Sequence, residues 1–428
     1  MRALCHRNYR LFFGGQGTSL IGTWMTRIAT GWLVYRLTHS AFLLGIVGFS
    51  GQIPIMLLGP FAGVWVDRWD RHRTLVVTQV LSMVQSFWLA GLALAHIITV
   101  RDIILLSLFQ GAINAFDMPA RQAFVIQMVE DRRDLSNAIA LNSSMVNGAR
   151  LIGPSLAGII IAAVGEGYCF LIDGISYIAV IASLLMMRIV VAQPRSRRTR
   201  VLAELKEGWH YVSHSTPIRS ILLLLAVVSL VGMPYTVLMP IFAGRVLHGG
   251  PHTLGFLMGA SGVGALTGAI VLATRRSVLG LGRVVMFTAM GFGVGLMSFA
   301  SSRWLALSLP LMMLTGFCMM TQMASSNTIL QTIVQEDKRG RVMSFYAMAF
   351  QGAAPFGSLI AGALASRIGA PRTLMIGGSI CVLGGLWFRT QLPRIRSVIR
   401  PIYKKLGIIP EVAAGMQAAA GLCTPPEE

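Results

Sequence analysis

Apolar runs of about twenty residues recur along the whole chain, separated by short polar interruptions. A helix needs about 20 apolar residues to cross roughly 30 Å of hydrocarbon, where its backbone polar groups must be satisfied internally. Of the 428 residues, 54% are hydrophobic and 12% are charged, which excludes an ordinary soluble domain. The pattern predicts an all-α, polytopic membrane protein with twelve transmembrane helices. The predicted spans are 10–36, 41–66, 74–96, 103–126, 138–163, 168–190, 219–244, 253–275, 283–301, 304–329, 342–366 and 371–390.

The formal net charge of +20 is distributed unevenly, in a way that indicates membrane topology. Most lysines and arginines lie in the N-terminal segment, in alternate loops and in the C-terminal tail, and such an excess marks the cytoplasmic side. The opposite loops contain six arginines: Arg36, Arg101, Arg245, Arg303, Arg367 and Arg372. We therefore expect a multi-pass protein of the plasma membrane, the bacterial inner membrane, with both termini cytoplasmic. Topology explains the charge, so the lipid bilayer is an expected partner and nucleic acid is not.

A basic segment divides the chain into two similar halves. We predict an N-terminal six-helix bundle at 1–190, a cytoplasmic linker at 191–218, a C-terminal six-helix bundle at 219–390 and a basic cytoplasmic tail at 391–428. The linker contains a predicted amphipathic helix through Leu202, Leu205, Trp209 and Val212. At an offset of about 205 residues, Glu130-Asp131-Arg132-Arg133 matches Glu336-Asp337-Lys338-Arg339, and Gly153-Pro-Ser-Leu-Ala-Gly158 matches Gly357-Ser-Leu-Ile-Ala-Gly362. Internal repeats of this kind are typical of transporters, and they predict two pseudo-symmetric bundles.

The loop after the second predicted span carries a charged motif. It reads Gly63-Val-Trp-Val-Asp67-Arg68-Trp-Asp-Arg71-His-Arg73. This stretch resembles the G-x-x-x-D-R-x-G-R-[KR] motif between helices 2 and 3 of the major facilitator superfamily, with Asp70 at a usual glycine and His72 at a usual basic residue. The resemblance implies the major facilitator fold and a conformational motif made by Gly63, Asp67, Arg68, Arg71 and Arg73. Glycine lets helices approach closely, and arginines anchor a loop at an anionic membrane surface.

The fifth predicted span carries a second motif, which includes Gly153, Pro154 and Gly158. It resembles the G-x-x-x-G-P-x-x-G-G motif of exporters in the same superfamily, with alanine at two glycine positions. Two other stretches, Pro119-Ala-Arg-Gln-Ala123 and Arg339-Gly-Arg-Val-Met-Ser344, look like the branch that contains drug, macrolide and siderophore (enterobactin-type) exporters. The resemblance implies export. Close, bent helix packing is an alternative explanation of the small residues and the proline.

Polar side chains inside the predicted spans are the candidate functional residues, because a charge at the bilayer centre costs roughly 2.5–3.5 kcal/mol even on insertion scales. In spans 1, 4 and 5 they recur at helical spacing, so each set forms one face. The candidates for proton coupling are Asp117, Arg150, Arg121 and Arg27, and those for the substrate cavity in this half are Gln16, Thr23, Gln110, Asn114 and Asn147. An ion-pair network that only joins helices is the alternative. Asp173 is expected to be structural.

Asp117 is predicted to be the titrating group, with Arg150 as its principal partner. Counted along their spans at about 1.5 Å of rise per residue, both residues lie near the middle of the membrane. Their depths agree to within about one helical turn. Movement of a guanidinium past a carboxylate changes how readily that carboxylate takes up a proton. Arg121 and Arg27 are the reserve partners. Many proton antiporters of the superfamily have an arginine where this chain has Ser107, so proton coupling does not follow from the resemblance alone.

The second half has no charged residue near mid-membrane in its predicted spans. Its cavity candidates are Tyr235, Gln322, Met323, Ser325 and Gln351, and we expect them to influence substrate choice more than energy coupling. Methionines cluster in the tenth and eleventh predicted spans of the chain, and methionine surfaces adapt to irregular ligands. Core packing is the alternative for most of them.

The function predicted from these features is ion-gradient-driven, proton-coupled efflux of a small, partly lipophilic molecule such as a drug, macrolide or siderophore, by alternating access. No G-x-x-x-x-G-K-[ST] loop exists, so ATP is not the direct driver. No H-E-x-x-H or G-x-S-x-G motif occurs, so an enzyme is not expected. We expect a monomer with no cofactor and no metal site. An uptake carrier for a metabolite, a membrane enzyme and a sensor are the alternatives.

Overall fold

The computed structural model describes residues 2–128, 134–187, 201–275 and 277–405, and its regular elements are helices throughout. A short turn, η1 (Arg2–Cys5), precedes the first long helix. The first half consists of α1 (Arg7–Thr38), α2 (Ala41–Arg68), α3 (Arg71–Leu94), α4 (Val100–Met128), α5 (Leu135–Val164) and α6 (Glu166–Leu185). Helix α7 (Val201–His214) connects it to the second half.

The second half interrupts two of its membrane helices with π-helical turns. Its elements are α8 (Thr216–Val227), η3 (Val228–Gly232), α9 (Tyr235–Ile241), η4 (Phe242–Val246), α10 (Pro251–Ala273), α11 (Leu281–Ser301), α12 (Leu305–Ile333), α13 (Glu336–Ala347), η5 (Met348–Gly352), α14 (Ala353–Ile368) and α15 (Ala370–Lys405). A π turn adds a residue and leaves a backbone group without its usual helical partner. The Ser229 hydroxyl of η3 donates to the Phe350 carbonyl of η5, which joins two of these turns.

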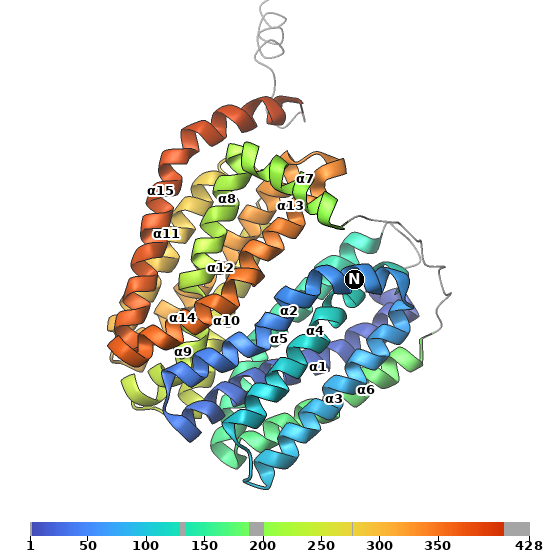
Figure 1. Cartoon of the computed structure of the whole chain (residues 1–428), viewed down its shortest axis with the longest axis vertical. Helices are drawn as coiled ribbons and strands as arrows, with labels where there is room; N and C mark the ends of the chain where they lie inside the picture. Colours follow the sequence, from blue (N-terminus) through green and yellow to red (C-terminus); the bar gives the residue numbers. More distant parts are fainter. Residues whose placement is uncertain (1, 129–133, 188–200, 276, 406–428) are drawn as a thin grey trace, which may run out of the picture.

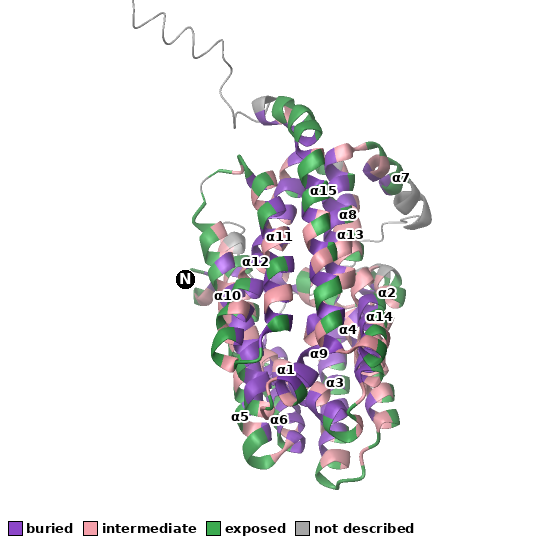
Figure 2. Ribbon diagram, turned by 90° about the vertical axis from the view of Figure 1, so that its left-hand side faces the viewer, coloured by how far each residue is buried: buried purple, intermediate pink, exposed green. Residues whose placement is uncertain are grey.

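Eleven segments among the described residues are long and apolar enough to cross a membrane. Two of them are composite, Thr216–Val246 and Lys338–Ile368. Helix α1, with 32 residues, is long enough but carries Arg27 and several amides and hydroxyls; it packs against α5 and α6 as the twelfth helix. Large hydrophobic side chains are exposed along the helices, and Trp88 and Phe287 are each 61% exposed. Figure 2 shows such exposed positions on the outer sides of helices, as expected for a surface in contact with lipid.

The predicted spans agree with the helices except at a few ends. Helix α15 continues to Lys405, beyond the predicted end at 390, because its sequence past that point keeps a helical apolar face, with Leu392, Ile395 and Ile399 buried. Helix α7 forms where the amphipathic helix was predicted, and Val212 is buried. Trp209, however, is 63% exposed although its ring centroid lies 6.1 Å from that of Phe345, so it does not belong to a buried face. The side chains of Leu202 and Leu205 lie outside the described residues.

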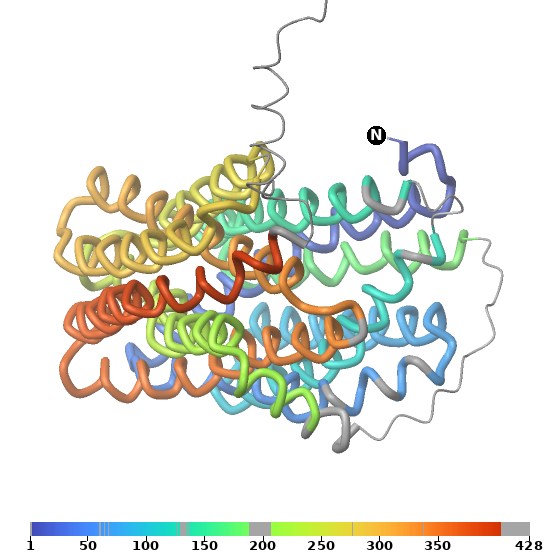
Figure 3. The backbone as a smooth tube through the Cα atoms, turned by 90° about the horizontal axis from the view of Figure 1, so that it is seen from above, coloured from blue at the N-terminus to red at the C-terminus, as the bar shows by residue number. Residues whose placement is uncertain are grey.

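The two halves lie side by side (Figures 1 and 3) and meet most closely at the end opposite α7 (Figure 1). Two helix pairs make this contact, α2 with α14 and α5 with α10. A Cβ added to Gly45 would lie 2.9 Å from Gly362 Cα, and one added to Gly158 would lie 2.9 Å from Gly255 Cα. Only glycine permits such backbone contact. The two pairs occupy equivalent positions in the halves, as the repeat of Gly158 and Gly362 predicts.

Toward the α7 end the ribbons of the halves diverge (Figure 1). Along α2, a Cβ added to Gly45 or Gly48 would meet the other half, whereas one added to Gly59 or Gly63 would meet nothing within 4 Å. Along α5, an added Cβ at Gly148 likewise meets nothing. The close helix approach expected at Gly63 is therefore absent from this arrangement, because the halves are apart at that end.

Candidate functional site

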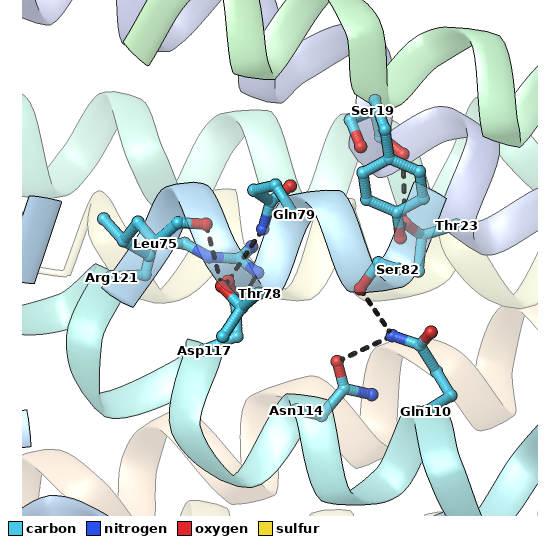
Figure 4. Close-up of polar contacts among 11 residues, drawn as sticks. Ser19, Thr23, Leu75, Thr78, Gln79, Ser82, Gln110, Asn114, Asp117 and Arg121 are labelled. Atoms are coloured by element: carbon cyan, nitrogen blue, oxygen red, sulfur yellow. Dashed lines mark hydrogen bonds and ion pairs between the residues drawn. The ribbon is translucent and has the colours of Figure 1, made fainter. Parts of the chain in front are cut away.

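Asp117 is the centre of a polar network inside the first half (Figure 4). It is only 2% exposed and lies on α4 opposite α3. Thr78 Oγ1 and Gln79 Nε2 donate to its Oδ1 at 3.0 and 2.7 Å, and Arg121 Nη2 donates to its Oδ2. Residues four apart share a helix face, so the Asp117–Arg121 pair follows directly from α4. Every oxygen of the carboxylate thus has a partner, and one partner carries a full positive charge.

The predicted pair between Asp117 and Arg150 is not formed. Arg150, on α5, directs Nη2 toward Met319 Sδ of α12 at 3.7 Å. Depth along a helix does not determine the direction of a side chain around it, and Arg150 points across the interface between the halves. Arg121, which was predicted as a reserve partner, is the residue that pairs with Asp117.

Arg150 and Arg27 flank the ring of Trp24 instead. Their guanidinium carbons lie 5.6 and 4.9 Å from the indole centroid, within the range of cation–π interactions. Neither arginine pairs with a carboxylate among the described residues. Arg27 is exposed although it lies in the middle of α1, so it borders open space inside the molecule. Two guanidiniums without counter-charges therefore stand near mid-depth beside an aromatic ring.

The other four cavity candidates of the first half differ in their surroundings. Gln110 Nε2 donates to Ser82 Oγ at 3.1 Å and to Asn114 Oδ1 at 3.3 Å, which forms a second polar cluster between α3 and α4, beside that of Asp117 (Figure 4). Thr23 Oγ1 lies 3.4 Å from the Tyr177 hydroxyl of α6. Gln16 is buried, and Asn147 donates to the carbonyl one turn before it, at Ser143.

Helix α3 supplies half of the network, and sequence reasoning missed it. Its inward face is formed by Thr74, Thr78, Gln79, Ser82, Gln85 and Ser86, all of which are buried. The spacing of four between Thr74, Thr78, Ser82 and Ser86 was the available signal. Hydroxyl residues are easily overlooked because they can also be satisfied by their own helix backbone.

A second buried carboxylate, Asp173 on α6, has a different environment. It is 2% exposed, and its Oδ2 accepts from Thr26 of α1 at 2.8 Å and from Ser86 of α3 at 2.9 Å. No arginine or lysine pairs with it among the described residues. Gly22 makes room for it, since a Cβ there would lie 2.6 Å from Asp173 Oδ1. Its position between three helices is compatible with the structural role expected from the sequence.

In the second half, the structure places three of the five candidates in the interior rather than beside open space. Tyr235 is fully buried, with its hydroxyl 3.0 Å from Ser261 Oγ. Gln322 and Ser325 are 1% and 0% exposed, and Gln322 Nε2 and Ser325 Oγ have no partner among the described residues. Met323 is half-buried, and Gln351 is exposed within η5. Only the last two remain accessible in this arrangement.

The charged motif after α2 contains a helix cap that explains its departure from the family pattern. Asp70 is the N-cap of α3 and accepts from the backbone N–H groups of His72 and Arg73 at 2.9 and 3.3 Å. Aspartate is among the best N-cap residues, so it can replace the usual glycine in this turn. Arg68 and Arg73 are exposed and Arg71 is half-buried; the side chain of Asp67 and residues 130–133 lie outside the described part of the chain.

The α5 motif serves two kinds of contact. A Cβ at Gly153 would lie 2.5 Å from Trp24 Cβ, so this glycine lets α5 approach α1 within the first half. Gly158 instead meets Gly255 of the second half, and Pro154 is accommodated inside α5. In the part of the chain that the structure describes, no group of three or more His, Cys, Asp or Glu side chains could hold a metal ion.

Comparison with known sequences agrees with this architecture. A sequence model of the transmembrane secretion effector family matches residues 3–421. The staphyloferrin A transporter of Staphylococcus aureus is 26% identical over 89% of this chain and 95% of its own length. The multidrug efflux pump Tap of Mycolicibacterium fortuitum is also 26% identical, over 89% of this chain and 94% of that pump.

Among solved structures, a bacterial homologue of the human lysosomal transporter Spinster, in an inward-facing and unoccupied conformation, superposes with a TM-score of 0.69. The alignment covers 93% of this chain and 98% of that one at 13% identity, so the likeness concerns the fold. With a family match over almost its whole length and two pseudo-symmetric helical bundles, the chain belongs to the transmembrane secretion effector family of major facilitator transporters.

Proposed function

We propose that the protein is a proton-driven exporter that expels a small, partly lipophilic molecule by alternating access. The relatives named as a siderophore transporter and a multidrug efflux pump support export of such a compound. The observation that carries the proposal is the buried network around Asp117, which contains a carboxylate able to exchange a proton and an arginine able to compensate it. Ionisable side chains inside a membrane are energetically costly, and for that reason they usually mark a functional site.

The α7 end faces the cytoplasm in this proposal, in a bacterial inner membrane. Arg68 and Arg73 lie exposed at that end, and basic residues favour the cytoplasmic side. The arrangement, closed at the glycine pairs and divergent near α7, is then the state that receives substrate from the cytoplasm. The proposed working unit is a monomer, since the two halves that move against each other belong to one chain.

Arg27 and Arg150 hold an acidic group of the substrate. Both guanidiniums lack a carboxylate partner among the described residues, and the Trp24 ring that both contact adds an aromatic surface for a lipophilic part. Arg150 itself contacts Met319 of the opposite half, so a molecule held by Arg150 would be linked to both halves. Contact with both halves is what couples binding to their relative movement.

Transport into everted membrane vesicles tests the function. Vesicles with this protein, energised with an acidic interior, should accumulate a transported dye or siderophore, and collapse of the pH gradient should abolish accumulation. Vesicles without the protein are the control. Accumulation that is unchanged when the gradient is collapsed would contradict proton coupling, and labelled-substrate counterflow without a gradient would still identify a carrier.

A further inference from the structure

A cavity of about 380 Å³ lies in the second half at the α7 end, away from the polar network. This volume is in the range of small-ligand sites, roughly 300–1,000 Å³. Its walls come from α8, α11, α12 and the extension of α15, which Figure 1 shows bending beyond the bundle. The apolar lining consists mainly of Ile221, Ile329, Phe388, Leu392, Ile395 and Ile399.

Three arginines stand at this apolar cavity: Arg283, Arg396 and Arg400. All three are exposed, and none has an ion pair or a hydrogen bond from its side chain to another described residue. Arg396 and Arg400 are four residues apart and so lie on one face of α15. No carboxylate is among the residues that line the cavity. The site therefore combines an apolar interior with uncompensated positive charge.

The depth of the cavity matches the level of lipid headgroups. Arg283 lies in the first turn of α11, which begins at Leu281, and Ile329 lies in the last turns of α12, which ends at Ile333. Membrane helices end where hydrocarbon gives way to headgroups. The first turn of α11 also presents the positive end of a helix dipole beside Arg283.

We propose that this cavity binds one anionic phospholipid, with its phosphate held by Arg283, Arg396 and Arg400 and an acyl chain against the apolar wall. Basic pockets beside membrane helices on the cytoplasmic side attract anionic headgroups. The cationic amine of a zwitterionic headgroup would be repelled by the three arginines. A free anion without an acyl chain would leave the apolar wall uncovered. The bound lipid would connect the end of α15 to the start of α11.

Native mass spectrometry of the full chain in neutral detergent tests this. Titration with phosphatidylglycerol should show one saturable bound lipid, which phosphatidylcholine does not displace. The variant Arg396→Gln/Arg400→Gln should bind it on the order of twenty-five-fold more weakly, at about fivefold for each arginine near a headgroup. Arg389→Gln/Arg394→Gln is the matched control, because it removes two charges from the same helix outside the cavity lining.

Arg283→Gln provides a second variant on a different helix and should also weaken binding. Equal losses in the cavity and control variants would show only diffuse surface charge and overturn the site. Displacement by glycerol 3-phosphate as effectively as by lipid would identify a free-anion site and would also overturn it. Equal binding of phosphatidylcholine would do the same by removing the role of the arginines.

Discussion

The two halves of this transporter share a fold but differ in what their interiors contain. The first half encloses Asp117, Arg121 and Asp173 within a network of amides and hydroxyls. The buried polar side chains in the middle of the second half are neutral, such as Thr315, Gln322 and Ser325. Among the described residues, the carboxylates inside membrane-spanning helices therefore lie in the first half only. We therefore expect energy coupling in the first half, with the second half adding neutral accessible side chains, Met323 and Gln351, to the substrate site.

The largest effect is expected from Asp117→Asn. The substitution keeps the size of the side chain and its bonds to α3 but removes the proton exchange. Transport in everted vesicles should no longer respond to a pH gradient, whereas counterflow of labelled substrate should persist. Asp173→Asn changes another buried carboxylate, whose partners among the described residues are the hydroxyls of Thr26 and Ser86, and so tests whether the effect is specific to Asp117. Normal pH-driven transport by Asp117→Asn would end the assignment of coupling to this residue.

Arg121→Gln should mainly reduce stability. It leaves the buried Asp117 carboxylate without its cation, and breaking a buried ion pair in this way costs about 3–5 kcal/mol. The free energy of unfolding, measured with denaturant in detergent, should fall by that order, and Asp117→Asn/Arg121→Gln should recover much of it. Arg150→Gln, which breaks no carboxylate pair, should cost far less. If Arg121→Gln and Arg150→Gln lowered the free energy of unfolding equally, the Asp117–Arg121 pair would have no special role in stability.

The shared fold of the halves can be tested at their glycine contacts. Gly158→Ala places a methyl group against the α10 backbone, and overpacking of this kind costs typically about 1–3 kcal/mol. The population should move toward a state open at that end, measurable as longer distances between spin labels on α5 and α10. Gly362→Ala should act similarly at the equivalent α14 contact. Gly63→Ala meets nothing in this arrangement, so an equal shift by that variant would contradict the reasoning.

The smallest effects are expected in the second half. Met323→Ala and Gln351→Ala change accessible side chains and should alter the relative transport of two substrates by about tenfold, the lower end of the effect of one methylene group in a pocket. Their pH response should remain that of the parent protein. Loss of the pH response with an unchanged substrate preference would reverse the proposed division between the halves.

The sequence predicts the helices well because bilayer thickness dictates their length and apolar content. It predicts the residues of the network less well, since that depends on how each helix is rotated about its axis. Asp117 and Arg150 are at comparable depth, yet Arg150 faces Met319, while the nearer Arg121 is fixed by helix geometry. Tyr235 follows a π turn and Pro234, which shift the helical phase, so its buried orientation could not be counted from the start of the span.

The π turn η5 has a mechanical consequence for the C-terminal half. It separates α13, whose Arg341 pairs with Glu207 of α7 at 2.5 Å, from α14, whose Gly362 sits on α2. Moving one residue out of the turn into regular helix would rotate α13 relative to α14 by about 100°. The Ser229 hydroxyl would then lose the Phe350 carbonyl that it now holds. The extra residue of η5 would therefore allow α13 to rotate about its axis while α14 keeps its contact with α2 of the first half.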